Sequence, residues 1–406
     1  MNLLKLKLHW QIFSALIIAV LFGYFFSEHV GYIGWLGELF LRALKMIIIP
    51  LIFSSIVSGV TSMGSGKSLG RLGLKTISYY LLTSLFAILT GLLFVNLFRP
   101  GIGVDLGFTA PAHEFTTEGT SVKDIFIRMI PDNIIRAMAE GNILSVIFFS
   151  IFLGFFITRV KDDYKQTLTN FFDGLFDVMM KVTMFIIRFT PLGILGIVAT
   201  EVARNADQLA SIAGSMAFYM LTVFVALTVH AFITLPVIVR FIGKARPYRH
   251  MKNMISPLIT AFSTASSSAT LPLTMDAVEN ESGVSNKITS FTLPLGATIN
   301  MDGTALYECV AVFFIAQVYG AELGLGQQVV VVATALLASI GAAGIPMAGL
   351  VMMTVILTAV NLPLEGVGLI LAVDRILDMY RTAVNVWSDS CAAVVIAKSE
   401  GETLQV

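Results

Sequence analysis

The sequence predicts an all-helical membrane protein that crosses the bilayer several times, and its composition and long uncharged stretches carry this prediction. Of the 406 residues, 56% are hydrophobic and only 13% are charged, whereas soluble domains carry about 25% charged residues. Such hydrophobicity excludes a disordered chain, and the presence of only two cysteines excludes a disulfide-rich scaffold. The 26 basic and 26 acidic residues balance, so we expect no nucleic-acid partner.

Stretches without Asp, Glu, Lys or Arg mark the expected helices in order, because roughly 20 apolar residues cross the hydrocarbon core. They are residues 8–27, 46–66, 76–98, 142–158, 209–239, 253–275 and 323–364. Three further spans are expected at 182–200, interrupted only by Arg188, at 288–321 and near 366–397. No small-residue cleavage site follows the first stretch, so we expect a span there and not a signal peptide.

The positions of lysine and arginine predict the orientation in the membrane. If the spans alternate from a cytoplasmic N-terminus, most basic residues of the connecting segments lie inside, among them Lys67, Arg159 and Lys398. The segment 99–141 is then an extracytoplasmic connector. We therefore expect a multi-pass protein of the cell (inner) membrane, in contact with lipid and with both termini cytoplasmic.

Two uncharged stretches do not fit simple spanning helices. The 253–275 stretch contains AFSTASSSATLP, and the 42-residue stretch 323–364 contains ASIGAAGIPMAG. A continuous helix of the second length would measure about 63 Å, twice the hydrocarbon thickness. We expect two re-entrant hairpins, about 253–288 and 323–362, the second with its tip at Gly341–Pro346; close helix packing is the alternative use of such Gly and Ser residues.

Each expected hairpin precedes a helix studded with polar residues, NMDGT after the first and DMYRTAVNVWSD after the second. Corresponding interrupted segments in two halves of a membrane protein indicate a binding site near the middle of the bilayer.

The last span carries one polar face. Its ionisable and amide residues are spaced by four, three, four and four, and at about 100° per residue they share an arc of roughly 80°; they are Asp374, Asp378, Arg381, Asn385 and Asp389. Ionisable residues inside a membrane are functional candidates. A structural ion pair between Asp378 and Arg381 is the alternative, but it leaves two carboxylates and an amide unexplained.

In the preceding span, Asn300, Thr304 and Glu308 share a face, whereas Asp302 lies about 200° from Asn300. Either the helix is unwound at NMDGT or Asp302 serves a different site. A bound cation would neutralise this aspartate, because hard cations take carboxylate, amide, hydroxyl and carbonyl oxygens. The third span could complete such a site with three oxygens on one face, those of Tyr80, Thr83 and Ser84. A face of this kind also serves helix packing, which is the alternative.

The same residues indicate the shape of a ligand. Arg381 offers a planar fork for a carboxylate, and Asp378 can hold an ammonium group. Ser267, Thr304 and Asn385 can donate hydrogen bonds to carboxylate oxygens. A molecule with two carboxylates and one amine, an acidic amino acid, satisfies all of them.

Five motifs carry a resemblance to a known family: YYLLTS (79–84), ASSSATLP (265–272), LPLGATINMDGTALYE (293–308), ASIGAAGIPMAG (338–349) and RILDMYRTAVNVWSD (375–389). Over essentially its whole length the chain resembles the dicarboxylate/amino acid:cation symporter family, which includes glutamate and aspartate transporters. The resemblance implies a secondary symporter and not an enzyme.

The resemblance also implies an architecture. We expect a homotrimer whose protomers have eight transmembrane helices and two re-entrant hairpins in inverted repeats, working as an elevator with the second hairpin as outer gate. Scaffold helices 1–2 would occupy residues 1–75 and helices 4–5 residues 142–206. The transport domain would comprise helix 3 (76–98) and residues 207–406, with helix 6, hairpin 1 (about 253–288), helix 7 (about 289–321), hairpin 2 (about 323–362) and helix 8 (about 364–398).

By the family pattern, the substrate pocket is lined by Ser267, Thr304, Ile345, Gly349, Asp378, Arg381, Thr382 and Asn385. Asp378 would hold the amino group and Arg381 the side-chain carboxylate. About three sodium ions would be co-transported, without an organic cofactor. The first sodium would bind Gly296, Asn300, Asn385 and Asp389, the second Thr298, Met301, Ser339, Ile340 and Ala342, and the third Tyr80, Thr83, Ser84, Asn300 and Asp302.

Glu308 and Asp389 bear on the coupling ion. Proton-cotransporting relatives have Glu where sodium-only archaeal relatives have Gln, and burial favours the protonated form of a carboxyl group; we expect Glu308 to carry a proton, with a permanently protonated structural acid as the alternative. Some proton-coupled relatives have Asn at the position of Asp389, so Asp favours sodium. Proton-only symport of glutamate or a C4-dicarboxylate is the alternative function.

The chain departs from the family at one charge. Archaeal relatives have Arg at the position of Ala265, and vertebrate relatives have Arg at that of Met379; here Arg375 is the candidate replacement.

Competing functions are less well matched to these residues. A dicarboxylate carrier does not need Asp378, a neutral amino acid carrier does not need Arg381, and a pure anion channel needs neither; an intramembrane aspartyl protease needs a carboxylate pair without an adjacent arginine.

Overall fold

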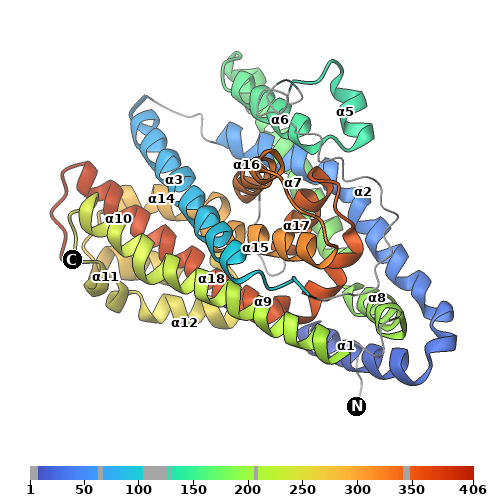
Figure 1. Ribbon diagram of the computed structural model, residues 1–406. Helices are drawn as coiled ribbons and strands as arrows, with labels where there is room; N and C mark the ends of the chain where they lie inside the picture. The colour runs from blue at the N-terminus through green and yellow to red at the C-terminus, as the bar shows by residue number, and fades with distance from the viewer. Residues whose placement is uncertain (1–7, 63–66, 104–126, 128–129, 205–208, 342–347) are drawn as a thin grey trace.

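The computed structural model describes residues 8–62, 67–103, 127, 130–204, 209–341 and 348–406 (Figure 1). The described residues form helices and turns and contain no strand, which confirms the all-helical prediction. Four of their helices are long and apolar enough to cross a membrane: Gly31–Thr61, Arg71–Phe98, Ala213–Phe241 and Asn286–Val318.

The N-terminal group of helices comprises α1 (Leu8–Phe25), α2 (Gly31–Ser62), α6 (Ile143–Ile157), α7 (Asp162–Ile187) and α8 (Thr190–Arg204), with the short α5 (Ile134–Glu140) before α6. Helix α8 packs on α1 and α2, and α2 also packs on α6 and α7. Gly37 permits close approach of α2 and α8, because a Cβ there would lie 2.8 Å from the backbone nitrogen of Ile197.

The span expected at 182–200 is wrong in one respect, since it is not a single helix. Helix α7 ends at Ile187, α8 begins at Thr190, and the two axes are bent by 50°. Pro191 explains the break: it has no N–H to bond the Ile187 carbonyl, and it disfavours helical geometry in the residue before it. The charged segment before residue 182 is also helical, because α7 begins at Asp162.

Charged helical turns also extend two other predicted spans. Helix α2 begins at Gly31 and not at residue 46, and α3 (Lys67–Phe98) begins before residue 76. The extra turns of α2 carry an exposed ion pair of 2.6 Å between Arg42 and Glu38. A search for uncharged stretches cannot find such turns.

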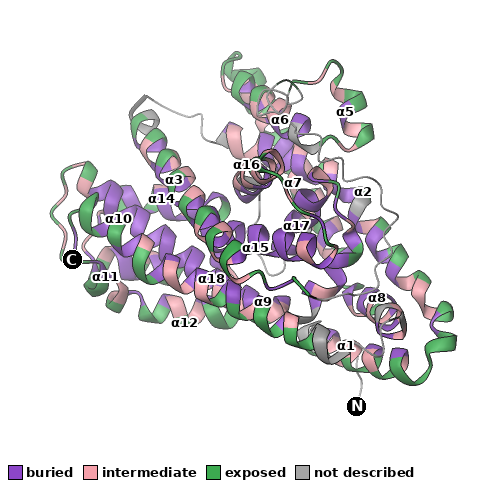
Figure 2. Cartoon of the chain, in the orientation of Figure 1, coloured by how far each residue is buried: buried purple, intermediate pink, exposed green. Residues whose placement is uncertain are grey.

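The C-terminal group surrounds α15 (Asp302–Val318), in which nearly every residue is buried (Figure 2). It comprises α3, α9 (Leu209–Val229), α10 (Leu235–Phe241), α11 (Pro247–Asn253), α12 (Ile255–Thr264), α13 (Ser267–Asp276), α14 (Asn286–Ile299), α16 (Leu325–Gly341), α17 (Ala348–Ala359) and α18 (Val367–Ser399). Helices α3, α9, α16, α17 and α18 all pack on α15.

The chain turns back at the predicted serine-rich motif. Ala265 has a left-handed backbone (φ 51°) that ends α12, and the Ser266 hydroxyl accepts a bond of 3.2 Å from the Ala269 N–H to begin α13. Each helix has ten residues, or about 15 Å, half the hydrocarbon thickness. In the second predicted hairpin α16 and α17 pack on each other; residues 342–347 of its expected tip lie outside the described residues.

Two helices are interrupted where they approach the centre of this group. Asn300 (φ −95°, ψ 87°) ends α14 and Met301 (φ −113°, ψ 51°) precedes α15, so the predicted unwinding at NMDGT is confirmed. Between α9 and α10, His230–Thr234 forms a π-helical turn, a rare element that is frequent at functional sites.

Candidate functional site

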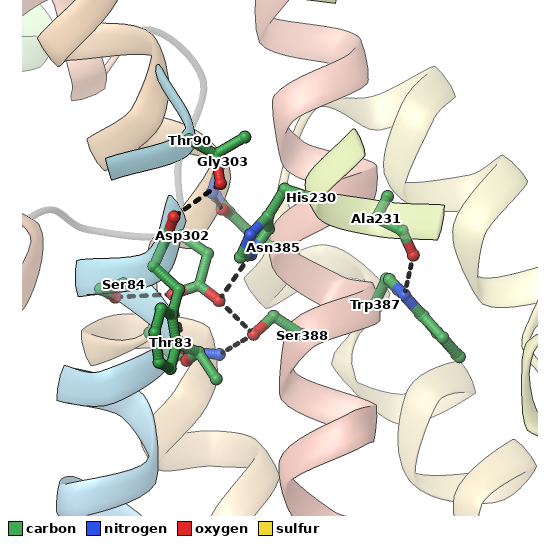
Figure 3. A network of polar contacts seen from close by, with 12 residues as sticks. Thr83, Ser84, Thr90, His230, Ala231, Asp302, Gly303, Asn385, Trp387 and Ser388 are labelled. Atoms are coloured by element: carbon green, nitrogen blue, oxygen red, sulfur yellow. Dashed lines mark hydrogen bonds and ion pairs between the residues drawn. The ribbon is translucent and has the colours of Figure 1, made fainter. Parts of the chain in front are cut away.

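The interruption between α14 and α15 places Asp302 at the centre of a buried polar network (Figure 3). Its Oδ1 accepts hydrogen bonds from Ser84 (2.6 Å) and Thr83 (3.3 Å) of α3. Its Oδ2 accepts a bond from Ser388 of α18 (2.6 Å) and lies 3.2 Å from His230 Nε2 in the π-helical turn. The predicted group of Thr83, Ser84 and Asp302 is therefore assembled from elements that are distant in sequence.

Asn300 lies beside this network and joins it to Asp389. Its Nδ2 donates to Asp389 Oδ1 (2.8 Å) and to Ser388 Oγ (3.0 Å). Within the described part of the chain its carbonyl oxygen, Oδ1, is buried and has no hydrogen-bond partner. Because buried amide oxygens are normally bonded, this atom marks room for a further donor or a cation.

Gly296 and Tyr80 complete the surroundings of Asp389. A Cβ on Gly296 would lie 2.5 Å from Asp389 Oδ1 and 2.8 Å from the Tyr80 hydroxyl, so only glycine permits this approach. The Tyr80 hydroxyl donates to the Thr292 carbonyl (2.7 Å). The residues predicted for the first and third cation sites, Asn385 excepted, thus lie together.

Asn385 binds the start of α15 instead. Its Oδ1 accepts a bond from the Gly303 N–H (2.7 Å), and its Nδ2 donates to Thr304 Oγ1 (3.1 Å) and contacts Met301 Sδ (3.3 Å). The Gly303 N–H is one of the donors that a helix leaves free at its first turn. Asn385 therefore fixes the broken helix against α18.

Arg381 lies in the middle of the polar face of α18, where two carboxylates bind its guanidinium group. Its guanidinium is bonded to Asp378 Oδ1 through Nε (3.0 Å) and Nη2 (2.8 Å), and to Asp374 Oδ1 through Nη1 (3.2 Å). It also stacks on the Tyr307 ring at 4.3 Å, a favourable cation–π geometry. With 1% of its surface exposed, it is a fully buried charge that requires these partners.

The other predicted substrate residues lie around this guanidinium or on neighbouring elements. A Cβ on Gly349 of α17 would be 2.7 Å from Arg381 Nη1, so α17 approaches the charge closely. Ser267, Thr304 and Thr382 are buried. Ile345 lies outside the described residues.

Glu308 is enclosed one turn beyond Thr304 in α15. Its exposed fraction is 0%, and in the described residues neither carboxyl oxygen has a hydrogen-bond partner. A buried carboxylate anion without donors is very unfavourable, so the environment of Glu308 suits a neutral carboxylic acid.

The residues of the predicted second cation site are only partly described. Met301 and Ser339 are buried, Thr298 is exposed, and α14 packs on α16. Ile340 belongs to α16, and Ala342 lies outside the described residues.

Sequence reasoning missed four residues of the site. Asp374 was recognised on the polar face but given no role, although its position seven residues before Arg381 predicts the contact. Tyr307, which donates to Asp374 (2.6 Å), and Ser388 both lie inside quoted motifs. His230 is a single histidine in an uncharged span, and nothing in the sequence pairs it with Asp302.

Comparison with known proteins agrees with this geometry. Residues 8–399 match the model of the sodium:dicarboxylate symporter family. The chain is 34% identical to the proton/glutamate-aspartate symporter of Escherichia coli, over 98% of this chain and 94% of the relative. It is 35% identical to the proton/sodium-glutamate symport protein of Geobacillus stearothermophilus (98% and 96%) and 34% identical to human excitatory amino acid transporter 3 (98% and 87%).

Proposed function

The chain belongs to the sodium:dicarboxylate symporter family, and from that premise we propose that it imports aspartate and glutamate by symport with sodium and a proton. The family consists of transporters, so the protein is a membrane transporter and not an enzyme. Intramembrane proteolysis by two of Asp302, Asp378 and Asp389 accordingly loses its support, and the ion pair of Arg381 with Asp378 also argues against it.

The observation that carries the proposal is the buried arginine of α18 between two carboxylates. An acidic amino acid would bring a carboxylate for Arg381 and an ammonium group for Asp378, so every buried charge would keep a partner after the substrate enters. A neutral amino acid lacks the side-chain carboxylate that is proposed for Arg381, so it would leave this arginine without a substrate partner. Thr304, Ser267, Thr382, Asn385, Gly349 and Ile345 are proposed to line the rest of the pocket.

Sodium is the proposed main coupling ion. Asp302 and Asp389 are two buried carboxylates near the free Asn300 carbonyl oxygen, and mixed carboxylate, amide and hydroxyl oxygens suit a hard cation. We assign one ion to Asp389, Asn300, Gly296 and Asn385, and another to Asp302, Asn300, Tyr80, Thr83 and Ser84. A third ion is assigned to Thr298, Met301, Ser339, Ile340 and Ala342.

A proton is the proposed second coupling ion, with Glu308 as its carrier. The unpartnered carboxyl group of this residue supports the assignment, since it can be neutral when buried and must meet water or a cation to ionise. The same feature also favours the alternative of proton-only symport, which the name of the Escherichia coli relative describes.

The proposed architecture is an elevator within a homotrimer of the cell (inner) membrane, with both termini cytoplasmic. Helices α1, α2 and α6–α8 would form the fixed scaffold; α3 and α9–α18 would move with the substrate. Packing within each group supports this division, because α2 packs on α6, α7 and α8, and α3, α9, α16, α17 and α18 pack on α15. The second hairpin, which touches Arg381 through Gly349, would open as the outer gate.

Uptake by proteoliposomes tests the proposal. Radiolabelled aspartate and glutamate are supplied while a sodium gradient and a pH gradient are imposed one at a time. An inward sodium gradient should drive accumulation above equilibrium, and an added proton gradient should increase it. Accumulation driven by the proton gradient in the complete absence of sodium would instead establish the proton-only alternative.

A further inference from the structure

Ser388 belongs to neither set of proposed sodium ligands, yet it touches both (Figure 3). It is buried in α18, one residue before Asp389, with an exposed fraction of 0%. Its Oγ lies 2.6 Å from Asp302 Oδ2 and 3.0 Å from Asn300 Nδ2. Ser388 is therefore the direct bridge between the carboxylate of one site and the amide shared by both sites.

The direction of these hydrogen bonds follows from counting protons. A carboxylate only accepts, and a serine hydroxyl has one proton, so Ser388 donates that proton to Asp302. Its oxygen then accepts one hydrogen of the Asn300 amide, and the second amide hydrogen is donated to Asp389 Oδ1 at 2.8 Å.

This count fixes the orientation of Asn300. Both amide hydrogens are used, so the carbonyl oxygen must point away from Ser388 and Asp389, and in the described residues it has no partner. The reversed amide would place its carbonyl oxygen against the Asp389 carboxylate, two acceptors facing each other. Ser388 thus helps to hold a cation ligand ready.

From this geometry we infer that Ser388 is a positioning residue that strengthens sodium binding at the Asp302 and Asp389 sites by holding the Asn300 amide in place for both. The inference rests on the proposed function. With the hydroxyl in place, neither ion has to order Asn300. Without the hydroxyl, Asn300 can rotate, and the first ion to bind must order a ligand that the second ion then finds ordered, which weakens binding and adds positive cooperativity.

Sodium binding in the absence of amino acid provides the test. The unfolding temperature of the purified full-length protein is measured over a range of sodium concentrations, with choline keeping the ionic strength constant, because a ligand of the native state raises it. The variants are Ser388→Ala and Ser388→Cys. The matched control is Ser390→Ala, since Ser390 is equally buried in α18 and its hydroxyl donates to the Trp387 carbonyl within the helix (2.8 Å).

The wild type and Ser390→Ala should give sodium curves with the same midpoint and Hill coefficient. Ser388→Ala should shift the midpoint to roughly tenfold higher sodium, the loss expected for one buried hydrogen bond, with a Hill coefficient no lower than that of the wild type. Ser388→Cys, whose thiol donates weakly, should fall between them. A purely structural role would lower the unfolding temperature equally at every sodium concentration.

Sodium curves of Ser388→Ala that superimpose on the wild type in slope and midpoint would overturn the inference; if this variant does not fold, superimposable curves of Ser388→Cys would do so. A wild type that ignores sodium contradicts the proposed function itself, whereas a sodium-dependent wild type with an unaffected Ser388→Ala contradicts only the role of Ser388.

Discussion

The buried residues of α15 and α18 divide into a group around Arg381, proposed to bind the substrate carboxylate, and a group around Asp302 and Asp389, proposed to bind sodium. Periodicity placed the α18 residues on one face, because a helix repeats regularly. It did not reveal what each side chain binds: Asn385 was expected in the substrate pocket and at the Asp389 site, and its side chain bonds the first turn of α15. Partners such as His230 and Tyr307 depend on packing between helices, which spacing within one helix does not encode.

Arg381→Cys should reduce aspartate and glutamate uptake by about 100-fold or more, because it removes charge-assisted bonds to the substrate carboxylate. Small neutral amino acids should then be accepted. Uptake of labelled aspartate, glutamate and serine measures both effects. Arg375→Gln is the control, since this arginine is 28% exposed and 3.5 Å from Asp378; unchanged aspartate affinity in Arg381→Cys would contradict the pocket assignment.

Glu308→Gln should keep aspartate uptake but abolish the accompanying proton movement, because the amide has the size of the neutral acid and no titrating group. A pH-sensitive dye inside proteoliposomes that are given an inward sodium gradient reports proton entry during uptake. The neighbouring Cys309→Ala, which is also fully buried, serves as the control. Substrate-driven acidification that persists in Glu308→Gln would remove the proton role.

At the scale of elements, interrupted helices create the site. The breaks at Ala265–Ser266 and Asn300–Met301 were predictable, since the first follows a run of small polar residues and the second separates polar residues that no regular helix could place on one face. Uncharged stretches do not reveal the break between α7 and α8. Pro191 does indicate it, because proline interrupts a helix. The π-helical turn at His230 has no comparable signal.

Gly296→Ala should weaken sodium binding at the Asp389 site by roughly tenfold, because the new methyl group would lie 2.5 Å from a carboxylate oxygen and overpacking of this kind costs about 1–3 kcal/mol. The sodium concentration for half-maximal aspartate uptake measures it. Gly214→Ala is the matched control, as a Cβ there meets nothing within 4 Å. Equal sodium requirements in both variants would show that α14 need not approach α18 so closely.

At the scale of the whole molecule, the C-terminal residues form ion pairs and hydrogen bonds with α3 and with the segment before α14. Glu400 pairs with Lys75 (2.6 Å) and Arg71 (2.5 Å) of α3. Glu402 accepts bonds from the backbone and hydroxyl of Ser285 before α14, and the Gln405 N–H donates to the Ser282 carbonyl. No pattern in the sequence indicates these contacts, because the partners are distant in the chain.

Glu400→Gln should lower the unfolding temperature modestly at neutral pH. The hydrogen bond from Lys75, with the bond and charge of Arg71, lowers the pKa of Glu400 in the folded protein. A group with a lowered pKa stabilises the fold above its unfolded pKa and loses this effect as the pH falls through its folded pKa. The difference between wild type and variant should therefore shrink on acidification below pH ~4.5, and it should shrink in high salt. Glu38→Gln, in an exposed pair within α2, is the control; a difference independent of pH and salt would contradict the ion-pair account.

Equilibrium binding of aspartate to the purified protein at increasing sodium concentration tests the central claim most directly. If buried carboxylates and the Asn300 carbonyl bind sodium that is coupled to the substrate, the aspartate dissociation constant should fall with a log–log slope steeper than about −1, because more than one ion binds with each substrate. A dissociation constant that is the same in sodium and in choline would contradict the account.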